Sequence, residues 1–129
     1  MAFLLDTNIA IHARDGHDRV LSKLAKHDGE VLISALSLAE LQRGLYQHPA
    51  HAALRAMRLD ILLAHIPVVP FDAAAARAYG AILAQCVWAK GRDYDRMIAA
   101  HALTLGATLV TNNAGDFRDV PGLILVNWV

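Results

Sequence analysis

The hexapeptide Phe3-Leu4-Leu5-Asp6-Thr7-Asn8 decides the fold of this chain. Residues 2–5 form a short apolar run, which is typical of a strand buried in a sheet. The run stops abruptly at Asp6, Thr7 and Asn8, residues that favour a loop or the N-cap of a helix. The segment therefore predicts a buried strand that feeds into a helix.

The same alternation continues along the chain. Four more short runs with β-branched residues predict strands at residues 31–33, 67–69, 107–110 and 123–126. Helical spacing of apolar residues predicts helices at residues 37–46, 51–64, 72–89 and 94–105, with Asp72 as an N-cap. Buried strands that alternate with helices favour an α/β fold, in which three layers (α/β/α) enclose a mostly parallel central sheet of about five strands.

The composition fits one globular domain over residues 1–129, since 56% of the residues are hydrophobic and 19% are charged. Twelve basic and twelve acidic residues give a formal net charge of zero, so the chain lacks the global basic field of many nucleic-acid binders. Cys86 is the only cysteine, which excludes an intrachain disulfide and fits a reducing compartment. No apolar run approaches the roughly 20 residues of a membrane span. We therefore expect a soluble, cytoplasmic protein.

Four acidic residues stand where the hydrophobic pattern predicts no charge. Asp6 and Asp116 follow predicted strands, and Glu40 and Asp95 lie near the starts of predicted helices. In a parallel sheet these positions can converge on one edge, where the carboxylates would repel one another unless a cation neutralised them. Oxygen ligands without cysteine suit Mg²⁺ or Mn²⁺, and such a site is typical of metal-assisted phosphodiester hydrolysis.

Each acid also has a purely structural interpretation. Asp6 can cap the first helix, and Glu40 can complete a capping box with Ser37. Asp95 can favour the first turn of its helix through its charge, and Asp116 can be an ordinary loop residue. Their joint placement is what favours a shared site.

Four segments in order make the sequence resemble the PIN-domain ribonucleases, specifically the VapC-type toxins of bacterial toxin–antitoxin pairs. The segments are FLLDTN (residues 3–8), SLAELQRG (37–44), DRMIAAHAL (95–103), and GATLVTNN (106–113) with Phe117 and VPGL (120–123). The resemblance covers nearly the whole chain. It implies a metal-dependent endoribonuclease that uses Mg²⁺ or Mn²⁺, forms a homodimer and is inhibited by a small VapB-like antitoxin.

Carried over by position, the resemblance implies an acidic core of Asp6, Glu40 and Asp95, with Asp6 and Asp95 on the metal. Two residues compete for the fourth position, Asn113 and Asp116. We take Asp116 as the fourth acid, because Asn113 brings no charge and suits a supporting role.

Other residues are expected to support the site. Thr7 would orient Asp6 through its hydroxyl, and Thr111 would do the same at the other strand end. Relatives often carry glycine where Arg92 stands, so the local loop can be reshaped and Asp93 can face the pocket as an outer acid.

A basic rim is the further expectation, since RNA phosphates need cations. Its candidates are Arg14, Arg43, Arg92, Arg96 and Arg118. Two alternatives stay open: a nuclease that acts on other single-stranded nucleic acid, and a non-catalytic module that binds a metal or a partner. Asn113 keeps the second alternative open, because one acid is missing at that position.

Overall fold

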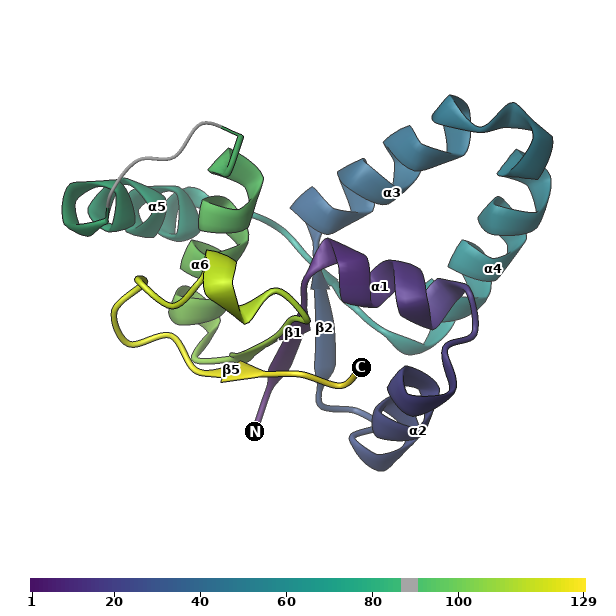
Figure 1. Ribbon diagram of the computed structural model, residues 1–129, viewed down its shortest axis with the longest axis horizontal. Helices are drawn as coiled ribbons and strands as arrows, with labels where there is room; N and C mark the ends of the chain where they lie inside the picture. The colour runs from purple at the N-terminus through teal and green to yellow at the C-terminus, as the bar shows by residue number, and fades with distance from the viewer. Residues whose placement is uncertain (87–90) are drawn as a thin grey trace.

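A parallel sheet forms the centre of the computed structural model, which describes residues 1–86 and 91–129 (Figure 1). Within these residues the sheet has five strands in the order β3-β2-β1-β4-β5. The strands are β1 (Phe3–Leu5), β2 (Val31–Ser34), β3 (Val68–Val69), β4 (Thr108–Val110) and β5 (Leu125–Val126). All neighbouring strands pair in parallel, so the predicted parallel sheet of about five strands is confirmed.

The helices connect these strands. They are α1 (Thr7–Arg14), α2 (Asp18–Lys26), α3 (Ala35–Gln47), α4 (Ala52–His65), α5 (Ala73–Gln85) and α6 (Asp93–Leu105), with 3₁₀ turns η1 (Pro49–His51) and η2 (Ala114–Asp116). The four predicted long helices appear as α3 to α6 with shifted ends, although residues 87–89 of one prediction lie outside the described residues. Among the described helices, none is both long and apolar enough to cross a bilayer.

The side chains of β1 alternate between two cores, which makes the fold three-layered. Phe3 and Leu5 join a cluster formed with α1, α2, α3 and α4, whereas Leu4 joins a cluster formed with α5 and α6. Figure 1 shows these two groups of helices on opposite sides of the strands. The predicted α/β/α architecture is therefore confirmed.

The N-cap of α3 differs from the sequence prediction, whereas the N-cap of α5 agrees with it. The Ser34 side chain accepts a hydrogen bond from the Leu36 N–H, at 3.1 Å, and caps α3. Ser37 lies buried inside that helix, so the predicted capping box of Ser37 and Glu40 is wrong. Asp72 caps α5 as predicted, because its Oδ1 accepts from the Ala75 N–H at 3.0 Å.

The carboxyl ends of β1 and β4 define the place where a ligand is expected. The strand order reverses at β1, whose neighbours are β2 on one side and β4 on the other. Ligands of open parallel sheets bind at such a switch point. The Asp6 N–H donates to the Val110 carbonyl oxygen at 3.0 Å, so the residues that follow β1 and β4 lie side by side.

Candidate active site

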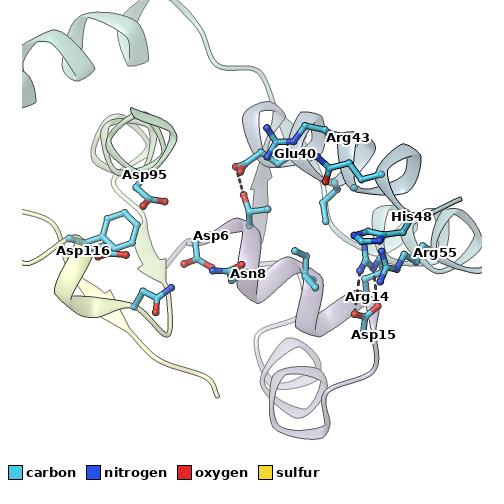
Figure 2. A pocket seen from close by; sticks show the side chains of 17 residues that line it. Asp6, Asn8, Arg14, Asp15, Glu40, Arg43, His48, Arg55, Asp95 and Asp116 are labelled. Carbon is cyan, nitrogen blue, oxygen red and sulfur yellow. Dashed lines mark hydrogen bonds and ion pairs between the residues drawn. The ribbon is translucent and has the colours of Figure 1, made fainter. Parts of the chain in front are cut away.

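A cleft of about 490 Å³ opens at this edge of the sheet and brings the four predicted acids together (Figure 2). Asp6 comes from the start of α1, Glu40 from α3, Asp95 from α6 and Asp116 from η2. Thr7, Asn113 and Arg43 line the same cleft. Side chains from four distant segments therefore face one space.

Asp6 is the most deeply buried of the four acids, with 5% of its surface exposed. Its Oδ1 accepts a hydrogen bond from the Ile9 N–H at 2.8 Å, so Asp6 caps α1 and also lines the cleft. Burial raises the pKa of Asp6, and a hydrogen bond with Thr111 partly opposes that rise. The structural and functional interpretations of Asp6 are thus compatible.

Glu40 is held by Thr7. The Thr7 hydroxyl donates to Glu40 Oε1 at 2.6 Å and lies 3.1 Å from the Ser37 hydroxyl oxygen. The expectation that Thr7 orients Asp6 is therefore wrong, because its single hydroxyl proton faces Glu40. The hydroxyl beside Asp6 is that of Thr111, as expected.

Asp95 lies in the first turn of α6 and interacts electrostatically with the other three acids. Burial raises the pKa of the Asp95 carboxyl, and the charges of Asp116, Asp6 and Glu40 raise it further. Arg92 opposes this effect, and its guanidinium lies 3.4 Å from Asp116 Oδ1. The acidic end of the cleft, formed by Asp6, Glu40, Asp95 and Asp116, therefore carries excess negative charge.

Asn113 and Asp116 both line the cleft, so the geometry leaves each available for the fourth position. The Asn113 N–H donates to Thr111 Oγ1 at 3.0 Å, which ties the start of η2 to the end of β4. Thr111 thereby links Asn113 to Asp6.

Some predicted residues lie elsewhere. Asp93 is exposed and accepts a hydrogen bond from the Tyr79 hydroxyl at 3.2 Å, away from the residues that line the cleft. Arg118 is also exposed and lies outside the lining.

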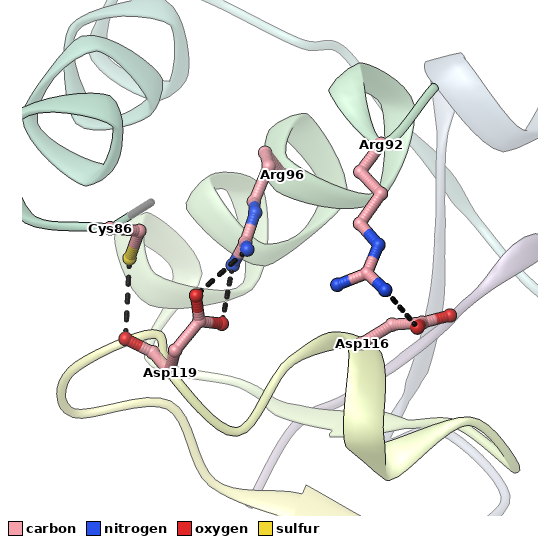
Figure 3. Close-up of polar contacts among 5 residues, drawn as sticks. All are labelled: Cys86, Arg92, Arg96, Asp116 and Asp119. Carbon is pink, nitrogen blue, oxygen red and sulfur yellow. Dashed lines mark hydrogen bonds and ion pairs between the residues drawn. The ribbon is translucent and has the colours of Figure 1, made fainter. Parts of the chain in front are cut away.

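Arg96 corrects the predicted basic rim. It is 3% exposed, and its two terminal nitrogens donate to the Asp119 carboxylate at 2.7 and 2.9 Å (Figure 3). Arg96 therefore fixes the loop of Asp119 against α6 and does not present its charge to a ligand. Arg92 belongs to the acidic end through its ion pair with Asp116.

Sequence reasoning missed the far end of the cleft. Asp15, His48 and Arg55 line it together with Arg14. No local pattern marks Asp15, His48 or Arg55, because they meet only when α3 and α4 fold back beside α1. Figure 2 shows Arg14, Asp15, His48 and Arg55 at the end of the cleft opposite Asp95 and Asp116, and Arg43 beside Glu40.

The acidic end fits a hard divalent cation by its chemistry. Its donors are carboxylate oxygens and the Asn113 amide, and burial together with the neighbouring acids raises the pKa of Asp95. Within residues 1–86 and 91–129, no three His, Cys, Asp or Glu side chains already form a group that could hold a metal ion.

The fold and the site define a class of protein. Residues 3–123 match the PIN domain family, and the chain belongs to that family. Its relatives indicate which group of PIN-domain proteins it resembles. The chain is 36% identical to "Ribonuclease VapC2" of Rickettsia felis over 99% of this chain and 98% of that protein. It is 33% identical to "tRNA(fMet)-specific endonuclease VapC" of Shigella flexneri, with the same coverage. The resemblance to VapC-type PIN domains is confirmed.

Solved structures agree with this grouping. The VapBC2 complex of Rickettsia felis bound to a DNA fragment from its promoter contains a similar chain, with a TM-score of 0.89 and 32% identity over 100% of both chains. DNA-bound VapBC of Salmonella typhimurium gives a TM-score of 0.87 and 26% identity, covering 100% of this chain and 99% of that one.

Proposed function

We propose that this protein is a metal-dependent endoribonuclease and the toxin of a toxin–antitoxin pair. One observation carries the proposal: in a member of the PIN family, Asp6, Glu40, Asp95 and Asp116 reach one cleft from four separate segments. The relatives named as ribonucleases and endonucleases support the same activity. Mg²⁺ or Mn²⁺ is the proposed cofactor, and Asp6 and Asp95 would hold it.

The bound cation would activate water and neutralise charge on the scissile phosphate. The chain's own residues do the rest of the work. Glu40, whose Oε1 accepts a hydrogen bond from Thr7, would accept a proton from the attacking water. The water oxygen would bond to phosphorus while the bond from phosphorus to the leaving ribose oxygen breaks, and the leaving oxygen would take up a proton from solvent. Arg92 restrains Asp116 beside Asp95, which keeps the acidic end assembled.

Side-by-side digestion of RNA and single-stranded DNA tests the activity and its substrate. The purified protein, freed of any partner, is expected to cleave RNA with Mg²⁺ or Mn²⁺ and to stop when EDTA is added. Cleavage of DNA alone would favour the alternative nuclease. Metal binding without turnover on a broad RNA panel would favour the non-catalytic module.

A VapB-like antitoxin is the proposed partner, since similar chains occur in VapBC complexes. An apolar groove of about 430 Å³ between α2 and α4 offers a surface for it. Leu21 and Ile61 line this groove and are 42% and 57% exposed. Large exposed apolar side chains in a groove are typical of protein contacts.

The partner is tested by co-expression with any small reading frame that lies next to this gene. Expression of the protein alone is expected to be toxic, and the neighbouring product is expected to relieve the toxicity and co-purify. Ile61→Asp should weaken co-purification, whereas Ile124→Asp, which changes an equally apolar residue that is 67% exposed, should not. Equal co-purification of the two variants would contradict the groove assignment.

The proposal includes a homodimer that acts in the cytoplasm, where its RNA substrates lie. Light scattering of the purified protein is expected to give twice the mass of one chain. A monomeric mass at all concentrations used for cleavage would contradict the dimer.

A further inference from the structure

The cleft has two chemically different ends (Figure 2). At one end lie the four acids already described. The other end, here named the cationic end, is formed by Arg14, His48 and Arg55, with Asp15 among them, whereas Arg43 lies beside Glu40. The residues of the cationic end come from α1, from the C-cap of α3 and from α4.

Arg14 anchors the cationic end. Its side chain is only 4% exposed, and its Nε and a terminal nitrogen donate to the Asp15 carboxylate at 2.9 and 3.3 Å. A guanidinium this buried needs a partner, and Asp15 provides it. The pair fixes one cation in place at the end of α1.

Asp15 does not neutralise the cationic end. Its pKa is lowered first by the hydrogen bond from Arg14, and the charges of Arg55 and Arg58 lower it further. Three arginines thus act on one carboxylate. His48 lies along the same wall and is exposed, and the exposed Arg43 adds a cation between this end and the acids. The balance at this end is positive, opposite in sign to the acidic end.

Helix α1 sets the distance between the two ends. Asp6 is its N-cap and Asp15 its C-cap, nine residues later. At 1.5 Å per residue, the caps lie about 13 Å apart along the helix axis. A single strand of nucleic acid that places one phosphate at the acidic end can therefore reach the cationic end with another phosphate of the same strand.

We propose that the cationic end binds a backbone phosphate of the RNA substrate, a short distance along the strand from the scissile phosphate. The proposal rests on the proposed ribonuclease function and extends it to a second subsite. Arginine presents several N–H donors in a fork that matches phosphate oxygens. Arg14 is buried and paired with Asp15, so it braces the wall of the cleft and leaves phosphate binding to the other arginines. Arg55 and Arg43 supply guanidinium groups that are not part of a described ion pair.

Phosphate contacts position a strand without reading its sequence. The cationic end would therefore set where RNA lies in the cleft and how tightly it binds, while the acidic end cleaves. Its loss should raise KM and leave kcat on bound RNA nearly unchanged.

Binding of a labelled single-stranded RNA of about 12 nucleotides tests the proposal in EDTA, where cleavage is absent. Arg55→Ala and Arg43→Ala should each weaken binding several-fold and reduce the slope of log K against log salt by about 0.7 per lost contact. Arg77→Ala, which removes an exposed arginine from α5, is the matched control and should change neither quantity. Thermal unfolding of each variant confirms that it is folded.

Cleavage of an RNA length series distinguishes phosphate binding by the cationic end from a purely structural role of its residues. The wild-type kcat/KM should rise with length once the strand reaches the cationic end, and Arg55→Ala should lose this rise but keep the rate on the shortest cleaved RNA. Equal losses at every length, or RNA affinity equal to wild type, would overturn the proposal. Unchanged RNA binding with lost antitoxin binding would assign the cationic end to the protein partner instead, which also overturns it. If no RNA is cleaved, the proposed function fails, and the binding series still decides the subsite.

Discussion

Two residues of the acidic end, Asp6 and Asp95, lower the stability of the protein when no cation is bound. Asp6 is buried, and Asp95 is partly buried among three other acids. Both have raised pKa values because burial disfavours the ionised form. A group whose folded-state pKa is raised contributes stability at low pH and loses it as the pH rises through the folded pKa.

Asp95→Asn should therefore stabilise the protein in EDTA. The Tm of the variant should exceed that of wild type, and the difference should grow from about pH 4 to about pH 7 as the wild-type carboxyl ionises. Mg²⁺ should raise the wild-type Tm and reduce this difference. Asp60→Asn, an exposed change on α4, is the control and should show no such growth. A difference in Tm that shrinks with rising pH would contradict the charge arrangement.

Thr7 gives a second residue-scale prediction, because its hydroxyl fixes Glu40 at 2.6 Å. Thr7→Val keeps the shape of the side chain and removes the donor, so kcat should fall about 10- to 100-fold, the usual cost of losing an orienting contact. Thr7→Ser should recover most of the rate. Rates measured on saturating RNA check this, and a loss confined to KM would contradict the assigned role.

At the scale of elements, α6 and the segment before β5 are joined through Arg96 and Asp119. Arg96→Met should destabilise the protein by about 1–3 kcal/mol, since the replacement removes a buried, charge-assisted contact. The salt dependence of RNA binding should not change. Urea unfolding measures the loss of stability, and RNA titration at several salt concentrations measures the salt dependence of binding. Arg77→Met is the control for an exposed arginine.

A reduced salt slope in Arg96→Met would contradict the structural role of Arg96. That result would indicate that Arg96 contacts RNA, as the sequence predicted.

Most elements were predictable because the strands are short apolar runs between polar residues. Helix α2 was not predicted: its nine residues include four charged ones, and only Val20 is buried. The start of α3 was placed late, since Ser34 ends β2 and caps the helix at once, leaving no loop between them.

For the whole molecule, the acidic end was predictable, whereas only Arg14 of the cationic end was among the predicted candidates. Asp6 directly follows a strand, so a parallel sheet places it at a known edge. The positions of His48 and Arg55 depend on the angle at which α3 and α4 fold back over α1, which no local pattern encodes. Arg96 was assigned wrongly for the same reason, because its partner Asp119 is 23 residues away.

The formal net charge of zero does not describe how the charges are distributed over the structure. Opposite charges are sorted to the two ends of one cleft, so a balanced total conceals a site with strong local fields. This arrangement suits a substrate that is itself anionic and needs a cation at one end. It also explains why composition alone argued against nucleic acid.

The most direct test of the central claim is the single-turnover rate of RNA cleavage by Asp6→Asn and Asp95→Asn in Mg²⁺. Each substitution removes a charge from the acidic end and is expected to lower the rate by more than about a hundredfold, while Asp60→Asn cleaves like wild type. Wild-type rates in both Asp6→Asn and Asp95→Asn would contradict the account, because the acids would then have no part in the reaction.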